Sequence, residues 1–186
     1  IFSELNFGKF TIRINNRKIL TGFFNSLELN SKVTDILRII DKIEKIGEDE
    51  VKSELSLLDI DSDKVSKIID FIRISGDAFT KIERLKNLAI TDEVFIEGVN
   101  ELETVINNIK ARGLDSNFYD VDLTIARGLD YYTGTVYETI LKDYPSIGSV
   151  CSGGRFDNLA TYYTDKKLPG VGISIGLTRL FYNWCI

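Results

Sequence analysis

The sequence contains no histidine and no methionine, and only two cysteines and two prolines among its 186 residues. The absence of histidine argues against a zinc site of the usual cysteine–histidine type. Cys151 and Cys185 alone do not make the disulfide framework of a small secreted protein, so a reducing, cytoplasmic setting fits best. No apolar run approaches the roughly 20 residues of a transmembrane helix, and the first residues do not read as a signal peptide.

The remaining composition is that of an ordinary globular protein, with 44% hydrophobic and 27% charged residues. This length suits one domain of moderate size, or a core that carries an inserted lobe. The net charge of −5 argues against a protein that binds nucleic acid by electrostatics alone. Because the sequence starts without methionine and stops inside an apolar helical pattern, we expect a fragment of a longer protein.

The first segment, residues 1–27, has the pattern of a strand followed by a helix. Phe10, Ile12 and Ile14 alternate with polar residues, which predicts a strand. Residues 17–27 follow as a predicted helix. For Asn15 to Arg17 between them we favour ordinary turn and cap chemistry.

Residues 28–115 contain no proline and carry apolar residues at helical spacing. We predict helices over residues 33–46, 48–58, about 62–72, 78–88 and 92–112, with Gly47, Gly76 and Gly113 as stops. The dense charges of this segment are most simply explained as a solvated helical surface.

Residues 116–186 return to strand patterns. Strands at 121–125 and 135–141 are predicted to form a hairpin around residues 127–135. After it we predict a short strand at 148–151, a tight loop at 152–155, a helix at 156–163, a buried strand at 171–175 and a helix from Leu177 to Cys185.

Three stretches in this last segment can carry chemistry. Arg127 offers a planar fork of donors for carboxylate or phosphate, and two tyrosines and two glycines follow it. The alternative is a surface hairpin with an incidental arginine–tyrosine stack. Gly153 and Gly154 suit a wall where a ligand presses on backbone, or an ordinary turn. Arg179, in the first turn of a helix, suits a phosphate, or is exposed or paired with an acid. The glycines at 170–176 do not have the G-x-G-x-x-G spacing of a dinucleotide site.

Together, these stretches resemble the signature motifs of histidyl-tRNA synthetases. RGLDYYTGTVYE at 127–138 and GSVCSGGRFDNL at 148–159 are similar to the two family signatures, and PGVGISIGLTRL at 169–180 is similar to the third class II motif. The resemblance covers essentially the whole chain. It implies an α+β class II fold, in which an antiparallel sheet flanked by helices is formed by residues 1–27 and 116–186, with an all-helical insertion domain at 28–115.

The resemblance also implies a reaction and its participants. Histidine and ATP, with Mg²⁺, would give histidyl-adenylate, and the histidyl group would pass to tRNA(His); the full-length protein would be a homodimer. Arg127 would contact the α-phosphate and the histidine carboxylate, Tyr131 and Tyr132 would line the imidazole pocket, Gly153 and Gly154 would close it, and Arg179 would lie at the γ-phosphate. Which tyrosine reads the imidazole stays open.

Two other functions are weighed against this one. The regulatory, non-catalytic subunit of ATP phosphoribosyltransferase is similar but often lacks part of the first signature or the third-motif arginine. Because all four side chains are present here, at Arg127, Tyr131, Tyr132 and Arg179, we favour the enzyme. A generic α+β domain without a site is the third alternative. The first and second class II motifs and the anticodon-binding domain are missing, so we expect the fragment alone to be inactive.

Overall fold

The computed structural model describes residues 2, 4, 7–126, 128 and 131–184, and the side chains of all of these except residues 162 and 182–184. They form a five-stranded sheet in the order β2-β1-β3-β4-β5. The strands are β1 (Phe10–Asn16), β2 (Tyr119–Val121), β3 (Thr135–Leu141), β4 (Ser149–Phe156) and β5 (Gly170–Ile175). The fold is therefore α+β, as predicted. The sheet is mixed rather than purely antiparallel, because β1 and β2 run parallel.

The predicted hairpin around residues 127–135 is wrong. β2 and β3 are not neighbours, because β1 lies between them and pairs with both. β2 also ends at Val121, four residues before the predicted end. There the Asp122 carboxylate accepts bonds from the backbone N–H and the hydroxyl of Thr124, and this local turn ends the strand.

Residues 152–155 and 156–163 also differ from prediction. The expected tight loop is the middle of β4, which pairs with β3 on one side and β5 on the other. The expected helix at 156–163 is the last residue of β4 followed by a short 3-10 helix, Leu159–Tyr162. Gly153 and Gly154 sit in a central strand because close neighbours leave no room for side chains there, as described below.

Apart from the one expected at 156–163, the predicted helices are confirmed in position, with one difference. They are α1 (Arg17–Ser26), α2 (Val33–Ile40), α3 (Ile43–Ile46), α4 (Glu48–Ser56), α5 (Ser62–Ile72), α6 (Ala78–Lys86), α7 (Glu93–Ala111) and α8 (Leu177–Trp184). The helix expected over 33–46 is two helices, α2 and α3, separated by a turn at Asp41 and Lys42. None of the helices in the described part of the chain is long and apolar enough to cross a bilayer.

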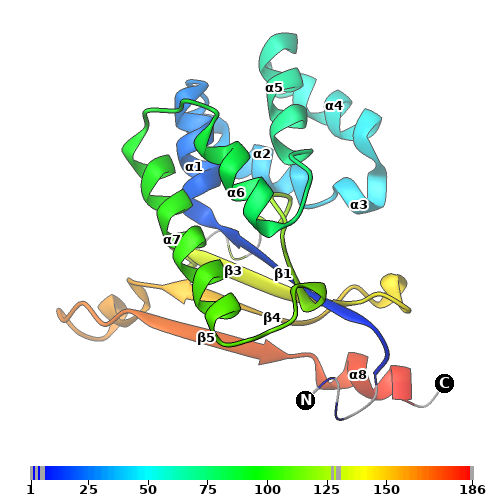
Figure 1. Ribbon diagram of the computed structural model, residues 1–186. Helices are drawn as coiled ribbons and strands as arrows, with labels where there is room; N and C mark the ends of the chain where they lie inside the picture. The colour runs from blue at the N-terminus through cyan, green and yellow to red at the C-terminus, as the bar shows by residue number, and fades with distance from the viewer. Residues whose placement is uncertain (1, 3, 5–6, 127, 129–130, 185–186) are drawn as a thin grey trace.

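Helices α1 and α7 pack together and connect the sheet to the other helices (Figure 1). Two glycines make this close approach possible. A Cβ on Gly22 of α1 would overlap the backbone N of Phe95, and a Cβ on Gly98 of α7 would lie 2.6 Å from the backbone N of Ile19. α7 thus packs on the sheet unit, although it falls within residues 28–115.

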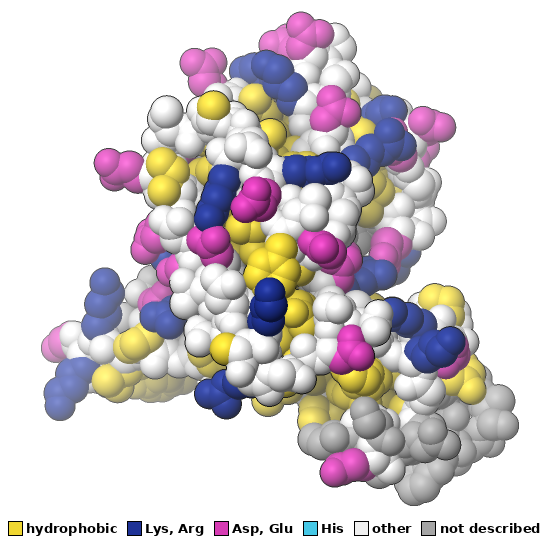
Figure 2. Space-filling model, in the orientation of Figure 1, with side chains coloured by type: hydrophobic (Ala, Val, Ile, Leu, Met, Phe, Trp, Pro, Cys, Tyr) yellow, Lys and Arg dark blue, Asp and Glu magenta, His cyan; other side chains and the backbone are white. Residues whose placement is uncertain are grey.

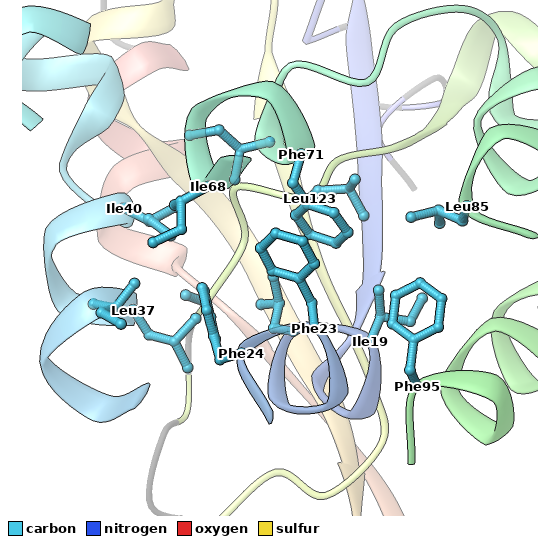
Figure 3. Close-up of a cluster of buried hydrophobic side chains, with 14 of the residues drawn as sticks. Ile19, Phe23, Phe24, Leu37, Ile40, Ile68, Phe71, Leu85, Phe95 and Leu123 are labelled. Carbon is cyan, nitrogen blue, oxygen red and sulfur yellow. The ribbon is translucent and has the colours of Figure 1, made fainter. Parts of the chain in front are cut away.

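The main core runs continuously from β1 and β2 into helices α1 to α7 (Figure 3). At its centre the rings of Phe23 in α1 and Phe71 in α5 stack with centroids 3.9 Å apart. Lys81 of α6 adds a polar link, because its buried ammonium donates to both carboxylate oxygens of Asp120 and to the carbonyl of Val121 in β2. The segment 28–115 contains no strand among the described residues, but its apolar residues share one core with the sheet.

Candidate active site

The ring of Tyr132 lies between Gly128 and Gly154, and it occupies the space that a side chain at either position would need. A Cβ on Gly128 would overlap the Cδ2 edge of the ring, and a Cβ on Gly154 would lie 2.8 Å from its Cδ1 atom. Gly128 also needs its positive φ of 66°, which side chains rarely adopt. The structure therefore brings together Tyr132, Gly154 and the start of the signature stretch.

Tyr131 and Tyr132 differ in environment. Their ring centroids are 4.4 Å apart, and Tyr131 is half exposed, whereas Tyr132 is partly buried. Burial, followed by the neighbouring phenol of Tyr131, raises the pKa of Tyr132. Each phenol can donate or accept a hydrogen bond.

Gly153 and Gly154 open on opposite faces of the sheet, because successive residues of a strand alternate. Gly154 aligns with Asn15 and Val136 across β1, β3 and β4, on the face that carries Tyr132. Gly153 is the cross-strand partner of Tyr137. The Tyr137 side chain extends over Gly153, and its hydroxyl donates to the carbonyl of Gly172 (2.7 Å) on β5. Only Gly154 shares a face with Tyr132, so Gly153 can reach that side only with its backbone.

The face that carries Tyr132 is lined by small residues on β4 and β5. Cross-strand partners Ser152 and Ser174 lie next to the partners Gly154 and Gly172. Among the paired residues of β4 and β5 on this face, only Phe156 has a side chain larger than serine, and its ring packs over Gly170 and Gly172. A ligand can therefore lie close to the backbone of these strands.

The end of the signature stretch is fixed to β4. The backbone N–H of Thr133 donates to the carbonyl of Arg155, and its hydroxyl donates to Asp157 (2.6 Å). Arg155 donates to the same carboxylate through Nε and NH2. The bond from Thr133, followed by the contacts with Arg155, holds the pKa of Asp157 below its usual range, so this carboxylate is charged at neutral pH.

The two residues just before the signature stretch are bonded to the end of β1 and the start of α1. The buried side chain of Asn15 donates to the carbonyl of Ile125 (3.0 Å), and the guanidinium of Arg17 donates to the carbonyl of Ala126 (3.4 Å). Arg127, the residue predicted to contact the reacting phosphate, lies outside the described residues. Sequence reasoning gave Asn15 and Arg17 only turn and cap chemistry. The one signal for their second role was an amide and a cation at alternate positions at the end of a strand.

Beside Ile125 the same face carries a charged cluster. The Arg13 guanidinium bonds to Glu44 of α3 and lies 3.4 Å from Asp122 and 3.9 Å from the buried Glu138. Burial disfavours the charge of Arg13, but the carboxylates outweigh it and raise the pKa of Arg13. A cleft of about 560 Å³ runs over this cluster, from Ile125 to the β4 residue Ser149. A larger cavity of about 980 Å³ lies between α6, the end of α7 and β2, and none of the predicted site residues lines it.

Arg179 lies at the other end of β4 from the tyrosines. It is in the first turn of α8, as predicted, and its largely exposed side chain donates to the carbonyl of Ser149. Gly154 is the fifth residue after Ser149 along the strand, a span of about 17 Å. Both the exposed alternative and the phosphate role are compatible with this position, and the role at ATP stays a prediction.

No metal site is assembled from the described side chains, since nowhere do three or more aspartate, glutamate or cysteine residues gather in a way that could hold an ion. Charges of both signs are interspersed over the helices on the face seen in Figure 2, without a large patch of one sign. Hydrophobic side chains show along β5 at the lower edge of that view, and Val171 and Ile173 are about two-thirds exposed.

Known proteins match the whole length of this chain. The histidyl-tRNA synthetase family matches residues 1–180. A histidine–tRNA ligase from Clostridium tetani is 61% identical over 182 residues, which are 98% of this chain and 41% of the relative. A histidine–tRNA ligase from Nostoc punctiforme is 49% identical over 97% of this chain and 39% of its own length. The chain thus spans about two-fifths of these relatives.

Solved structures give the same match in three dimensions. The crystal structure of histidyl-tRNA synthetase from Nostoc sp. PCC 7120 has a TM-score of 0.95 and 48% identity, and covers 99% of this chain and 44% of its own. A structure described as an ATP phosphoribosyltransferase regulatory subunit/histidyl-tRNA synthetase from Bacillus halodurans has a TM-score of 0.81 with 17% identity, over 98% of this chain and 46% of its own. At that identity the likeness concerns the fold alone.

Proposed function

Since the chain belongs to the histidyl-tRNA synthetase family, we propose that it forms part of the catalytic domain of an enzyme that activates histidine with ATP and transfers it to tRNA(His). The active protein is longer, is a homodimer and works in the cytoplasm, and the chain alone is inactive. The observation that carries the proposal is the Tyr132 ring, seated on Gly154 at the edge of a face of small residues.

The amino acid is placed by the tyrosines. A phenol of Tyr131 or Tyr132 forms a hydrogen bond with a ring nitrogen of the substrate imidazole. An amino acid whose side chain cannot form this bond would leave the phenol unpaired, so the site rejects it. Tyr132 is the better choice for this role, because Gly128 and Gly154 hold its ring in one place. The backbone of Gly154, with that of Gly153, closes the pocket.

The reaction needs a cation at the reacting phosphate. The histidine carboxylate oxygen forms a bond to the α-phosphorus of ATP, and the bond from this phosphorus to the β-phosphate oxygen breaks, releasing pyrophosphate. Negative charge on the α-phosphate is neutralised by the Arg127 guanidinium. Arg179 binds the γ-phosphate, about a strand length away along β4.

ATP fits the face that carries Tyr132, because Ser152, Gly154 and Ser174 leave its backbone open and Arg179 stands at its end. Mg²⁺ arrives on the phosphates of ATP, in keeping with its preference for phosphate oxygens and water over an all-protein cage.

Histidine-dependent ATP–pyrophosphate exchange in the full-length protein tests the proposal. Arg127→Ala is expected to lower the exchange rate by roughly a hundredfold or more. Arg127→Lys should restore little, because one ammonium cannot reproduce a planar fork of donors. A full-length protein that exchanges with no amino acid is instead the regulatory subunit, and normal exchange in folded Arg127→Ala protein removes this arginine from the reaction.

We also propose that the helical segment 28–115 is an insertion that contacts the acceptor end of tRNA. Six lysines of this segment are candidates for contacts with tRNA phosphates. Four of them bond to protein groups, namely Lys32, Lys42, Lys64 and Lys86. Lys45 and Lys67 are exposed and form no ion pair with any described residue, so they are the best candidates.

A deletion separates the two steps, provided that it spares α7. Replacing residues 28–90 by a short linker should leave the exchange reaction mostly intact and strongly reduce transfer to tRNA, with a loss that depends on salt. Replacing 28–115 would also remove α7 from α1 and unfold the sheet unit. Thermal unfolding and the mass of the dimer serve as controls, and unchanged transfer by the shorter deletion would make the segment a structural appendage.

A further inference from the structure

The side chain of Asn15 uses both ends of its amide, and its orientation is fixed by its partners. It is fully buried at the end of β1. One end faces the backbone N–H of Asn16 (2.8 Å), which can only donate, so this end is the oxygen. The other end is then the nitrogen, and it faces the carbonyl of Ile125 (3.0 Å), which can only accept.

The carbonyl that accepts this bond belongs to a buried stretch that leads into the signature motif. Ile125 and Ala126 are 3% and 1% exposed, and the next residue in the chain is Arg127. Arg17 supports the following carbonyl, that of Ala126, from the same end of β1. Two successive backbone carbonyls before Arg127 are therefore bonded to side chains more than 100 residues earlier, one from the end of β1 and one from the first residue of α1.

We infer that Asn15 is a positioning residue for Arg127, an inference that rests on the proposed function. Asn15 touches no reacting atom. It holds the carbonyl of Ile125, two residues before Arg127 in the chain. A displacement of a catalytic group by about 1 Å can lower a rate by about a hundredfold, so a shift of this stretch would weaken the stabilisation of developing charge. The row Asn15, Val136, Gly154 contacts residues on both sides of Arg127 in the chain, since Asn15 bonds to Ile125 and Gly154 lies against Tyr132.

Asn15→Asp in the full-length protein is the test, because it keeps the shape of the side chain and removes only the N–H donor to the Ile125 carbonyl. A carboxylate oxygen would then face the Ile125 carbonyl, and the stretch before Arg127 would move away. We expect kcat for histidine-dependent exchange to fall at least about tenfold, while the KM values for ATP and histidine change less than about threefold. A purely structural residue would lower the folded fraction and leave kcat per folded molecule unchanged.

Asn16→Asp is the matched control. Asn16 is equally buried and adjacent, but its side chain caps α1 at Lys18 and donates to Glu101 of α7 on the other face. It should lower the melting temperature and leave kcat unchanged. Equal loss of kcat in the two variants, or a normal kcat in Asn15→Asp, overturns the inference.

Two further results complete the design. Where Asn15→Asp does not fold, Asn15→Ser makes the same comparison, and failure of both to fold assigns Asn15 to sheet stability and overturns the inference. Loss of exchange in Arg127→Ala with normal exchange in Asn15→Asp rejects the positioning role alone. An unmodified full-length protein without histidine-dependent exchange, or normal exchange in Arg127→Ala, rejects the proposed function instead.

Discussion

Replacing Gly154 by alanine should push Tyr132 out of its seat. The added methyl would lie 2.8 Å from the ring atom Cδ1 of Tyr132 and 2.8 Å from the carbonyl oxygen of Thr135. Gly154 is not among the glycines with positive φ, so alanine causes no backbone strain and the whole cost is steric. Because the carbonyl belongs to the neighbouring strand, the ring is the part that yields.

The size of the effect follows from these contacts. Inserting a methyl into a packed site costs roughly 1–3 kcal/mol, which lowers the melting temperature of a unit of this size by about 2–12 °C. If the displaced phenol loses a hydrogen bond to the imidazole worth about 0.5–1.5 kcal/mol, the KM for histidine rises roughly 2- to 13-fold. The KM for ATP should change less.

Gly172→Ala provides the control for Gly154→Ala. Gly172 is the partner of Gly154 on β5 and faces the same side, but the closest atom to its added methyl is the edge of the Phe156 ring at 3.3 Å. Exchange assays at several histidine and ATP concentrations, with thermal unfolding, compare the two full-length variants. A normal histidine KM in a destabilised Gly154→Ala protein, or equal rises in both variants, would show that Tyr132 does not bind histidine.

Two further predictions concern stability. Thr133 and then Arg155 lower the pKa of Asp157, so this carboxylate stabilises the fold above the ordinary aspartate pKa of about 3.9 and loses that contribution as the pH falls below it. Asp157→Asn should therefore make the free energy of unfolding depend less on pH below about pH 4, and an unchanged pH dependence there would contradict this. Lys81→Ala leaves polar groups of β2 without their donor and should lower the free energy of unfolding in urea by about 1–3 kcal/mol. Lys86→Ala removes a half-exposed ion pair on the same helix and should lower it by less than about 1 kcal/mol. Similar losses in the two variants would refute the role given to burial.

Local patterns predicted most of the helices and strands, because their signals lie within a few residues. α7 shows an apolar stripe with a glycine stop, and β3 was placed at its observed bounds. The break between α2 and α3 was missed, because one stripe runs through both. At this break Glu44 turns toward Arg13, a contact between residues 31 apart that no local pattern contains.

The order of the strands could not be predicted in the same way. β2 and β3 are close in the sequence and read as a hairpin, but β1 enters between them from over 100 residues earlier. Nothing in residues 119–141 records this neighbour. The inserted β1 also brings Asn15 to Ile125, so the same non-local pairing that defeated the topology prediction creates the contact before Arg127.

The glycines of β4 show why a local rule fails where a ligand is expected. A run of two glycines predicts a loop, since glycine weakens a strand. Here each glycine leaves room for a tyrosine from elsewhere, Gly154 for Tyr132 on one face and Gly153 for Tyr137 on the other. The cost in strand propensity is offset by these ring contacts, which the sequence does not reveal.

The alternation in β5 also shows that a local pattern can identify a strand without identifying its buried face. Gly170, Gly172 and Ser174 alternate with Val171, Ile173 and Ile175, which correctly predicts a strand. The strand was also predicted to be buried, and that part of the prediction is wrong. Val171, Ile173 and Ile175 are 42–67% exposed, and the small residues form the face that carries Tyr132. A strand that must admit a ligand on one face cannot fill that face with its own side chains. The small residues therefore mark the face on which we propose that the substrates bind, whereas the aliphatic residues, normally the guide to the core, point away from it.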